Sequence, residues 1–319
     1  MTLAWPTPLH FGPWLLDARL GLGGTSEVWR ARHVDKPGEF ALKRLLPIFR
    51  DDATVNALFH RETRLLQLLD SPRLPRLLAR GTCNDIPWLA MPLYAGASLR
   101  ALLHDGPMST HEAYWLAAEL AEALADLHAA GVVHCDVSPG NVQITRDGQV
   151  VLLDLGIAQR LGADEPLDTL ALRGKSPYLS PEQVARQPLD ARSDLFALGS
   201  VLVELLTGTP PFARPERSAT LAAVLAVAWQ GPMRLPEAVR PLVVALLAAV
   251  PGQRADSARA LARQLRGLVA DVPRARAQVI ARVAAVPLRV EAPIWQAAEL
   301  RGEPVTNPGM DAGATVAER

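Results

Sequence analysis

The spacing of apolar residues changes character near residue 98 of this 319-residue chain. In the first ninety residues the apolar runs are short and broken by Gly and Pro, as in WLLDARLG, EVWRARH, FALKRLL and PWLAMPL, which predicts strands. The exception is residues 51–69, where an Asp precedes apolar residues at helical spacing and predicts one capped helix. Beyond Ser98 the pattern is helical, and residues 109–131 begin with a Ser-x-x-Glu capping box and end on Gly. We therefore expect an α+β fold, with a small β-rich part containing one helix followed by a larger helical part.

The composition excludes some classes of binding partner and indicates the cellular compartment. The 33 basic and 33 acidic residues give zero net charge, which argues against nucleic acid or a membrane surface as a broad partner. Cys83 and Cys135 are the only cysteines, too few for a disulfide framework, which indicates a reducing compartment. The first residues lack the basic start and apolar core of a secretory signal, and the longest apolar runs are too short to span a bilayer. We expect a cytoplasmic protein without membrane insertion.

Two features of the N-terminal part suggest phosphate chemistry. GLGGTSEVWRA, residues 21–31, lies between two predicted strands, and its glycines would let backbone N–H groups approach phosphates closely. Taken alone, it is equally compatible with an ordinary Gly-rich hairpin. Lys43 lies in an apolar strand and must face a cleft or find a partner, for which Glu62 on the predicted helix is available. The alternative is an edge lysine and an unrelated surface glutamate.

Three short stretches further along give these features a common meaning. They are H-x-D-x-x-x-x-N at 134–141, Asp-Leu-Gly at 154–156 and Ser-Pro-Glu at 180–182. Together with the Gly-rich loop, the strand lysine and the helix glutamate, they stand in the order and at the approximate spacing of the protein-kinase signature set. The chain resembles the bacterial eukaryotic-like, or Hanks-type, serine/threonine protein kinases over roughly residues 12–269. The resemblance implies a bilobal fold, with an N-lobe at about 12–91, a hinge at 92–96 and a C-lobe at 97–269. Residues 270–319 lose periodicity and are expected to form a partly disordered tail.

The resemblance also implies a role for each motif residue, with ATP and Mg²⁺ as cofactors. Lys43, steadied by Glu62, would hold the α- and β-phosphates, and Asp136 would accept the proton of the attacking hydroxyl. Asn141 and Asp154 would hold Mg²⁺. In the hinge, the carbonyl group of Pro92 and the N–H group of Tyr94 would face adenine. The residues expected to line the ATP site are Leu20, Gly21, Leu22, Gly23, Gly24, Thr25, Ser26, Glu27, Val28, Ala41, Lys43, Met91, Pro92, Tyr94 and Gln143.

The same resemblance predicts structural partners in the C-lobe. Glu182 would pair with Arg254, and Asp194 would brace the catalytic loop from the helix beneath it. The alternative in both cases is a surface charge.

Two departures concern regulation and the adenine pocket. Cys135 replaces the arginine that receives an activation-loop phosphate, and Thr169 is the main phosphate acceptor in an acidic segment, so we expect activity that does not depend on phosphorylation. Cys135 itself is expected to be a small buried filler. Gln143 stands where the family has an apolar residue under adenine, and its amide either hydrogen-bonds the nucleotide or lowers its affinity.

The third departure from the family pattern involves two positions that have exchanged their residue types. Ser138 replaces the lysine that reaches toward the transferred phosphate, and Lys175 replaces the threonine that normally partners that lysine. A cation and a hydroxyl have therefore exchanged places, so we include Lys175 and Ser138 among the catalytic candidates.

These observations favour an active protein kinase that phosphorylates Ser/Thr hydroxyls of proteins, including itself, in intracellular signalling. The alternative is a pseudokinase that binds nucleotide or a partner without catalysis. A small-molecule kinase shares the loop motif, but the long segment from Asp154 to Glu182, together with Arg254, argues for a peptide-docking platform. The sequence names neither the protein substrate nor the oligomeric state.

Overall fold

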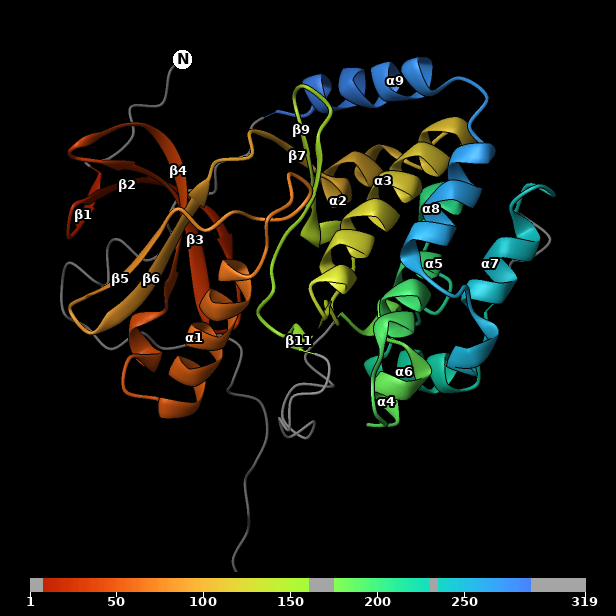
Figure 1. The fold of residues 1–319 in the computed structure, drawn as a ribbon, viewed down its shortest axis with the longest axis horizontal. Helices are drawn as coiled ribbons and strands as arrows, with labels where there is room; N and C mark the ends of the chain where they lie inside the picture. Colours follow the sequence, from red (N-terminus) through yellow and green to blue (C-terminus); the bar gives the residue numbers. More distant parts are fainter. Residues whose placement is uncertain (1–7, 161–174, 230–234, 288–319) are drawn as a thin grey trace, which may run out of the picture.

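The computed structural model describes residues 8–160, 175–229 and 235–287, which form two lobes (Figure 1). The smaller lobe is a β-sheet with one long helix, and the larger lobe is mainly helical, so the predicted α+β bilobal architecture is confirmed. The strand β6 ends at Pro92 and β7 begins at Gly96, so the chain crosses between the lobes over residues 93–95.

The N-lobe is built on a six-stranded antiparallel sheet in the order β1-β2-β3-β4-β6-β5. Its strands are β1 (Leu9–Phe11), β2 (Trp14–Leu22), β3 (Ser26–His33), β4 (Lys36–Leu45), β5 (Ala79–Cys83) and β6 (Ile86–Pro92). The helix α1 (Ala53–Gln67) starts where the Asp52 side chain accepts a hydrogen bond from the N–H group of Val55, as the sequence predicts.

The C-lobe is organised around two buried helices, α3 and α5, which contact each other. Its helices are α2 (Leu99–Leu102), α3 (Thr110–Ala129), α4 (Pro181–Val184), α5 (Ala191–Thr207), α6 (Arg217–Leu225), α7 (Arg240–Leu246), α8 (Ala258–Gly267) and α9 (Val272–Ala285). Its strands are β7 (Gly96–Ser98), β8 (Val132–Val133), β9 (Val142–Thr145), β10 (Val150–Leu152) and β11 (Gln159–Arg160). The strands β9 and β10 pair in an antiparallel arrangement.

The helix α3 shows why these residues form this lobe. The expected capping box is present, because Ser109 Oγ accepts from the N–H group of Glu112 and the Glu112 carboxylate accepts from the N–H group of Ser109. The helix is buried on nearly every side, which suits an element packed against α5, α8 and α9 at once. Its far end leads through β8 into the catalytic loop, so the core helix fixes where that loop begins.

Within residues 270–319, which are expected to form a partly disordered tail, Val272–Ala285 form the helix α9, which lies across α3 in Figure 1. Ala275, Val279 and Val283 are spaced four apart and buried, and Arg282 pairs with Glu112 at 2.8 Å. Small apolar residues between arginines give a weak periodic signal, yet they bury a continuous stripe. Residues 288–319 lie outside the described part.

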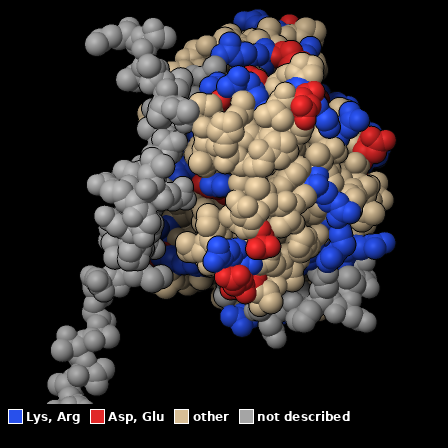
Figure 2. Space-filling model, turned by 90° about the vertical axis from the view of Figure 1, so that its left-hand side faces the viewer, with Lys and Arg blue, Asp and Glu red and all other residues tan. Residues whose placement is uncertain are grey.

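On the face that Figure 2 shows, basic and acidic side chains lie close to one another around a wide area of uncharged residues, in keeping with zero net charge. Within the described ranges, none of the helices combines the length and the apolar character needed to cross a bilayer.

Candidate active site between the lobes

Lys43, on β4, forms ion pairs with Glu62 on α1 and with Asp154 after β10. Its Nζ atom donates to both carboxylate oxygens of Glu62 on α1, at 2.6 and 2.8 Å, and to Asp154 Oδ1 at 2.9 Å. Burial alone would lower the pKa of Lys43, but the carboxylates of Asp154 and Glu62 outweigh burial and raise it. The Lys43 ammonium in turn lowers the pKa of Asp154 to about 2. Lys43 and Glu62 are both buried, which excludes the alternative of an edge lysine and a surface glutamate.

The catalytic loop is held from below by a single carboxylate. Asp194, buried on α5, accepts hydrogen bonds from the N–H groups of His134 and Cys135 at 2.8 and 2.9 Å, and it also binds His128 Nε2. Cys135 adopts the left-handed conformation with φ of 67°, which a non-glycine residue keeps only when its surroundings enforce it. The predicted bracing role of Asp194 agrees with this geometry.

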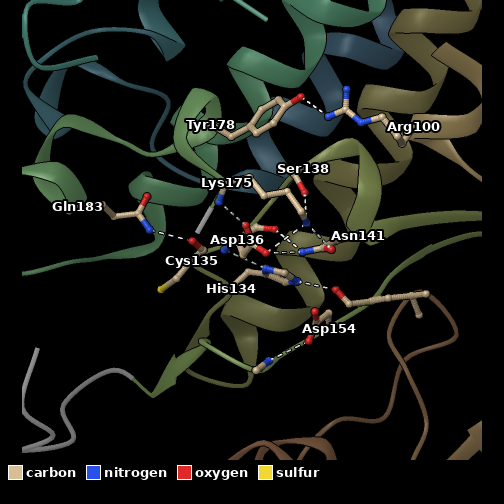
Figure 3. Close-up of polar contacts among 12 residues, drawn as sticks. Arg100, His134, Cys135, Asp136, Ser138, Asn141, Asp154, Lys175, Tyr178 and Gln183 are labelled. Carbon is tan, nitrogen blue, oxygen red and sulfur yellow. Dashed lines mark hydrogen bonds and ion pairs between the residues drawn. The ribbon is translucent and has the colours of Figure 1, made fainter. Parts of the chain in front are cut away.

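Within the loop, Asp136 and Asn141 face each other. Asn141 Nδ2 donates to the carbonyl oxygen of Asp136 at 2.7 Å and to its carboxylate Oδ2 at 2.8 Å. The His134 ring accepts from the Asp136 N–H group through Nδ1 and contacts the carbonyl oxygen of Leu153 through Nε2 (Figure 3). Since a carbonyl only accepts, Nε2 carries the proton. The ring thereby fixes the catalytic loop relative to the strand end that carries Asp154.

Lys175 enters this loop from a distant segment. Its Nζ atom donates to Ser138 Oγ at 2.9 Å and to Asn141 Oδ1 at 2.8 Å, and it lies 3.4 Å from Asp136 Oδ2. The backbone N–H group of Lys175 also donates to Asp136 Oδ1, at 3.1 Å. Ser138 is fully buried, whereas the Lys175 side chain is 44% exposed. The two residues that the sequence pairs by exchange are therefore in contact, as Figure 3 shows.

Strand register assembles one face of the sheet around Lys43. Val28 on β3 lies opposite Lys43, and Ala41 on β4 lies opposite Met91 on β6. Because side chains alternate along a strand and register partners share a face, these four residues and Leu89 lie on one side of the sheet. This shared face agrees with the expectation that Val28, Ala41, Lys43 and Met91 line the ATP site.

Gln143 makes a contact that the sequence does not reveal. Its Nε2 atom donates to the carbonyl oxygen of Tyr94, in the hinge, at 2.9 Å. The Tyr94 hydroxyl accepts from the N–H group of Arg76. The amide of Gln143 is therefore bound to the backbone of the hinge, a partner that the sequence does not predict.

The Gly-rich hairpin has room beside its backbone. A Cβ atom placed on Gly21 or Gly24 would meet no atom within 4 Å, so the chain's own packing does not demand glycine there. The N–H group of Gly23 donates to the carbonyl of Ser26 at 2.8 Å and closes the turn. The neighbouring side chains Leu20 and Leu22 are 38% and 50% exposed.

The side chain of Glu27 does not join this site. It lies on the opposite face of the sheet from Val28 and is buried against Arg44, with Nη2 at 2.7 Å from Oε1. If Glu27 contacts ATP as predicted, the contact must therefore come from its backbone and not from its side chain. The reason is strand alternation, since a residue next to one that faces the cleft must face away from it.

The oxygen donors present suit a hard divalent cation. Asn141 Oδ1 and the Asp154 carboxylate, whose side chain is 50% exposed, are the oxygen types that bind such ions together with phosphate groups. No cluster of three or more His, Cys, Asp or Glu side chains able to hold a metal exists among the described residues, so the protein would supply only part of the coordination.

Two further groups support the segment that follows Lys175. Glu182 and Arg254 form the predicted ion pair, with both side chains buried and Nη1 at 2.6 Å from Oε1. Gln183, which sequence reasoning missed, donates from Nε2 to the carbonyl oxygen of Cys135 at 2.8 Å. Thr169 lies outside the described residues.

A second missed group links α2, α5 and the turn at Tyr178. The Tyr178 hydroxyl donates to Glu204 Oε2 at 2.6 Å, and Arg100 donates to Glu204 Oε1 at 2.8 Å and to the Tyr178 hydroxyl at 2.5 Å. Burial, reinforced by Glu204, raises the pKa of Tyr178, so its hydroxyl stays protonated. No sequence signal connects Arg100 with Glu204, 104 residues away.

The fold and this set of contacts define the class to which the chain belongs. The family model for the protein kinase domain matches residues 14–265, and the chain is a member of that family. It is 36% identical to the serine/threonine-protein kinase PknB of Mycobacterium leprae over 213 residues, which covers 65% of this chain and 34% of the relative. It is 35% identical to PknH of Mycobacterium tuberculosis strain CDC 1551 over 233 residues, covering 72% and 36% of the two chains. The chain thus spans about a third of the length of these relatives.

Proposed function

We propose that the chain is an active protein kinase, which transfers the γ-phosphoryl group of ATP to Ser/Thr hydroxyls of proteins with Mg²⁺ as the metal. The observation that carries the proposal is the contact of Lys43 with both Glu62 and Asp154 beside a loop in which Asp136 and Asn141 are hydrogen-bonded. Phosphoryl transfer depends mainly on positioning and charge neutralisation, and each group has a matching task.

The tasks follow from the atoms available. Lys43, kept protonated by its two carboxylate neighbours, would bind phosphate oxygens, and Glu62 would hold its side chain in place. Asp136 would orient the attacking hydroxyl and accept its proton, since its carboxylate is 16% exposed and held by Asn141. Asn141 and Asp154 would hold the metal, which neutralises charge on the β- and γ-phosphates when bound.

The pseudokinase alternative has no support among these contacts, because the lysine, the metal-holding residues and the proton acceptor named above are all present and hydrogen-bonded to one another or to Glu62. The free thiols of Cys83 and Cys135 agree with action in the reducing cytoplasm.

The test is to incubate the purified chain with labelled ATP and Mg²⁺, and to follow label on the chain and on a generic basic protein. We expect transfer to both, its loss on chelation with EDTA, and its return when Mg²⁺ is restored. Nucleotide binding without transfer under all these conditions would contradict the proposal and favour a pseudokinase.

A further inference from the structure

Lys175 is bound in a way that an ordinary surface lysine is not. An ammonium group has three hydrogens to donate, and three oxygen atoms surround this one: Ser138 Oγ, Asn141 Oδ1 and Asp136 Oδ2. Two of these residues are the proton acceptor and a metal-holding residue of the proposed function. The ammonium group therefore lies among the reacting groups, although its side chain comes from a segment 34 residues beyond Asn141.

The loop has the shape needed to receive this side chain. A Cβ atom on Gly140 would lie 3.5 Å from Lys175 Nζ and 3.7 Å from Cε, so the end of the lysine side chain lies beside this glycine. A side chain longer than alanine at residue 140 would occupy the same space. Ser138, in turn, is too short to reach into the cleft, and its hydroxyl serves as an acceptor for Lys175.

The backbone that carries Lys175 is anchored beyond the lysine itself. The carbonyl oxygen of Lys175 accepts from the N–H group of Tyr178 at 3.0 Å, which closes a turn. Tyr178 is buried and bonded to Glu204 and Arg100, so the turn is fixed to α5 and α2. The backbone of Lys175 is therefore held in a defined position, which restricts where the ammonium group at the end of its long side chain can lie.

We propose that Lys175 is a catalytic residue, whose ammonium group neutralises the charge that develops on the transferred phosphoryl oxygens, with Ser138 as the hydroxyl that positions it. The proposal rests on the proposed function. In the transfer, the bond from the γ-phosphorus to the β–γ bridging oxygen breaks, and a bond from the substrate hydroxyl oxygen forms. The hydroxyl proton passes to Asp136, ADP leaves with the bridging oxygen, and Lys175 stays protonated throughout. An aligned cation in such a site acts on the transition state more than on the ground state.

The first test separates catalysis from substrate docking. Lys175→Ala should lower kcat about 10²-fold and change the KM for ATP less than threefold. Lys36→Ala, at an exposed lysine of β4, is the matched control and should leave both constants unchanged. A raised KM for the protein substrate with an unchanged kcat would overturn the proposal and assign Lys175 to docking.

The second test rebuilds the usual arrangement. The double variant Ser138→Lys with Lys175→Thr should be at least tenfold more active than the Lys175→Thr single variant, because the two sites should be strongly coupled. Additive losses in a double variant that melts at the wild-type temperature would overturn the exchange of roles.

The third test does not need turnover. Lys175→Ala should weaken binding of Mg²⁺–ADP–aluminium fluoride, which mimics the transferred group, by tenfold or more, while binding of Mg²⁺–ADP stays within twofold. Equal effects on both complexes would contradict the proposal. A wild-type chain that binds the analogue but phosphorylates nothing would contradict the proposed function instead, so the two failures can be distinguished.

Discussion

The side-chain amide of Gln183 donates a 2.8 Å hydrogen bond to the carbonyl oxygen of Cys135. Both residues are buried. The resemblance to the kinase family implies that Cys135 replaces an arginine that would bind the activation-loop phosphate. The neutral amide thus ties the segment after Lys175 to the catalytic loop without a phosphate. Burial also raises the pKa of the Cys135 thiol well above its usual value, so it stays neutral.

We predict from this contact that activity does not require a phosphorylated activation segment. Phosphatase-treated protein and a Thr169→Ala variant should each keep most of the wild-type initial rate, because a neutral hydrogen bond holds the loop. Initial rates on a fixed protein substrate, with phosphate content checked by mass spectrometry, measure this. A tenfold loss that rephosphorylation restores would refute the prediction.

Replacing Asp136 by Asn should lower kcat by a factor of about 10² or more, because the amide cannot accept the hydroxyl proton. Nucleotide affinity should hardly change, since no described contact joins Asp136 to Lys43. Titration calorimetry with ADP and single-turnover kinetics measure the two effects. Asp105→Asn, at an exposed aspartate of the C-lobe, serves as the control. Wild-type turnover in the Asp136 variant would remove it from the catalytic set.

The buried Glu182–Arg254 pair should matter for stability. Arg254→Ala leaves the Glu182 carboxylate buried without its cation and should lower the free energy of unfolding by about 3–5 kcal/mol. Urea denaturation measures the change, and Arg263→Ala at an exposed position of α8 should change it little. A loss below about 1 kcal/mol would show that water replaces the lost partner.

The same pair gives stability a pH dependence. Burial alone would raise the pKa of Glu182, but its hydrogen bonds with Arg254 and Ser193 hold the pKa below the usual value. A lowered pKa means that the stabilisation is present above the unfolded-state pKa and is lost as the pH falls through the folded-state value. The difference in unfolding free energy between wild type and Glu182→Gln should therefore be largest near neutral pH and shrink in acid. The Glu237→Gln variant, at an exposed site, should show no such trend, and a constant difference at Glu182 would contradict the assignment.

The helix α9 should behave as part of the domain. Val279→Asp places a carboxylate in the buried stripe of α9, and it should lower the melting temperature by several degrees. Val272→Asp, at the 41% exposed start of the same helix, should have little effect. Equal melting temperatures for both variants would show that the helix contributes nothing to stability.

The sequence predicts those parts of the site in which chemistry ties residue type to spacing. Lys43, Glu62, Asp136 and Asp154 are predictable because they stand in the order and at the approximate spacing of the protein-kinase signature set that the chain resembles. Gln183 and Arg100 are missed because an amide or a guanidinium group gives no hint of a partner 48 or 104 residues away. Glu27 is expected in the ATP site because the Gly-rich motif includes it, and the motif gives no sign that strand alternation turns its side chain away from the cleft.

The Glu27–Arg44 ion pair has a mechanical consequence for the Gly-rich hairpin. The pair joins β3 to β4 beside Lys43, and one step nearer the tip the N–H group of Leu46 donates to the carbonyl oxygen of Thr25. Both ties lie on the β3 side of the hairpin, whereas the β2 side enters the tip through Gly23 and Gly24, the more permissive residues. The strand β3 is therefore tied to β4 close to the tip, so bending of the tip over a nucleotide would pivot on β3 and leave Val28 in register with Lys43.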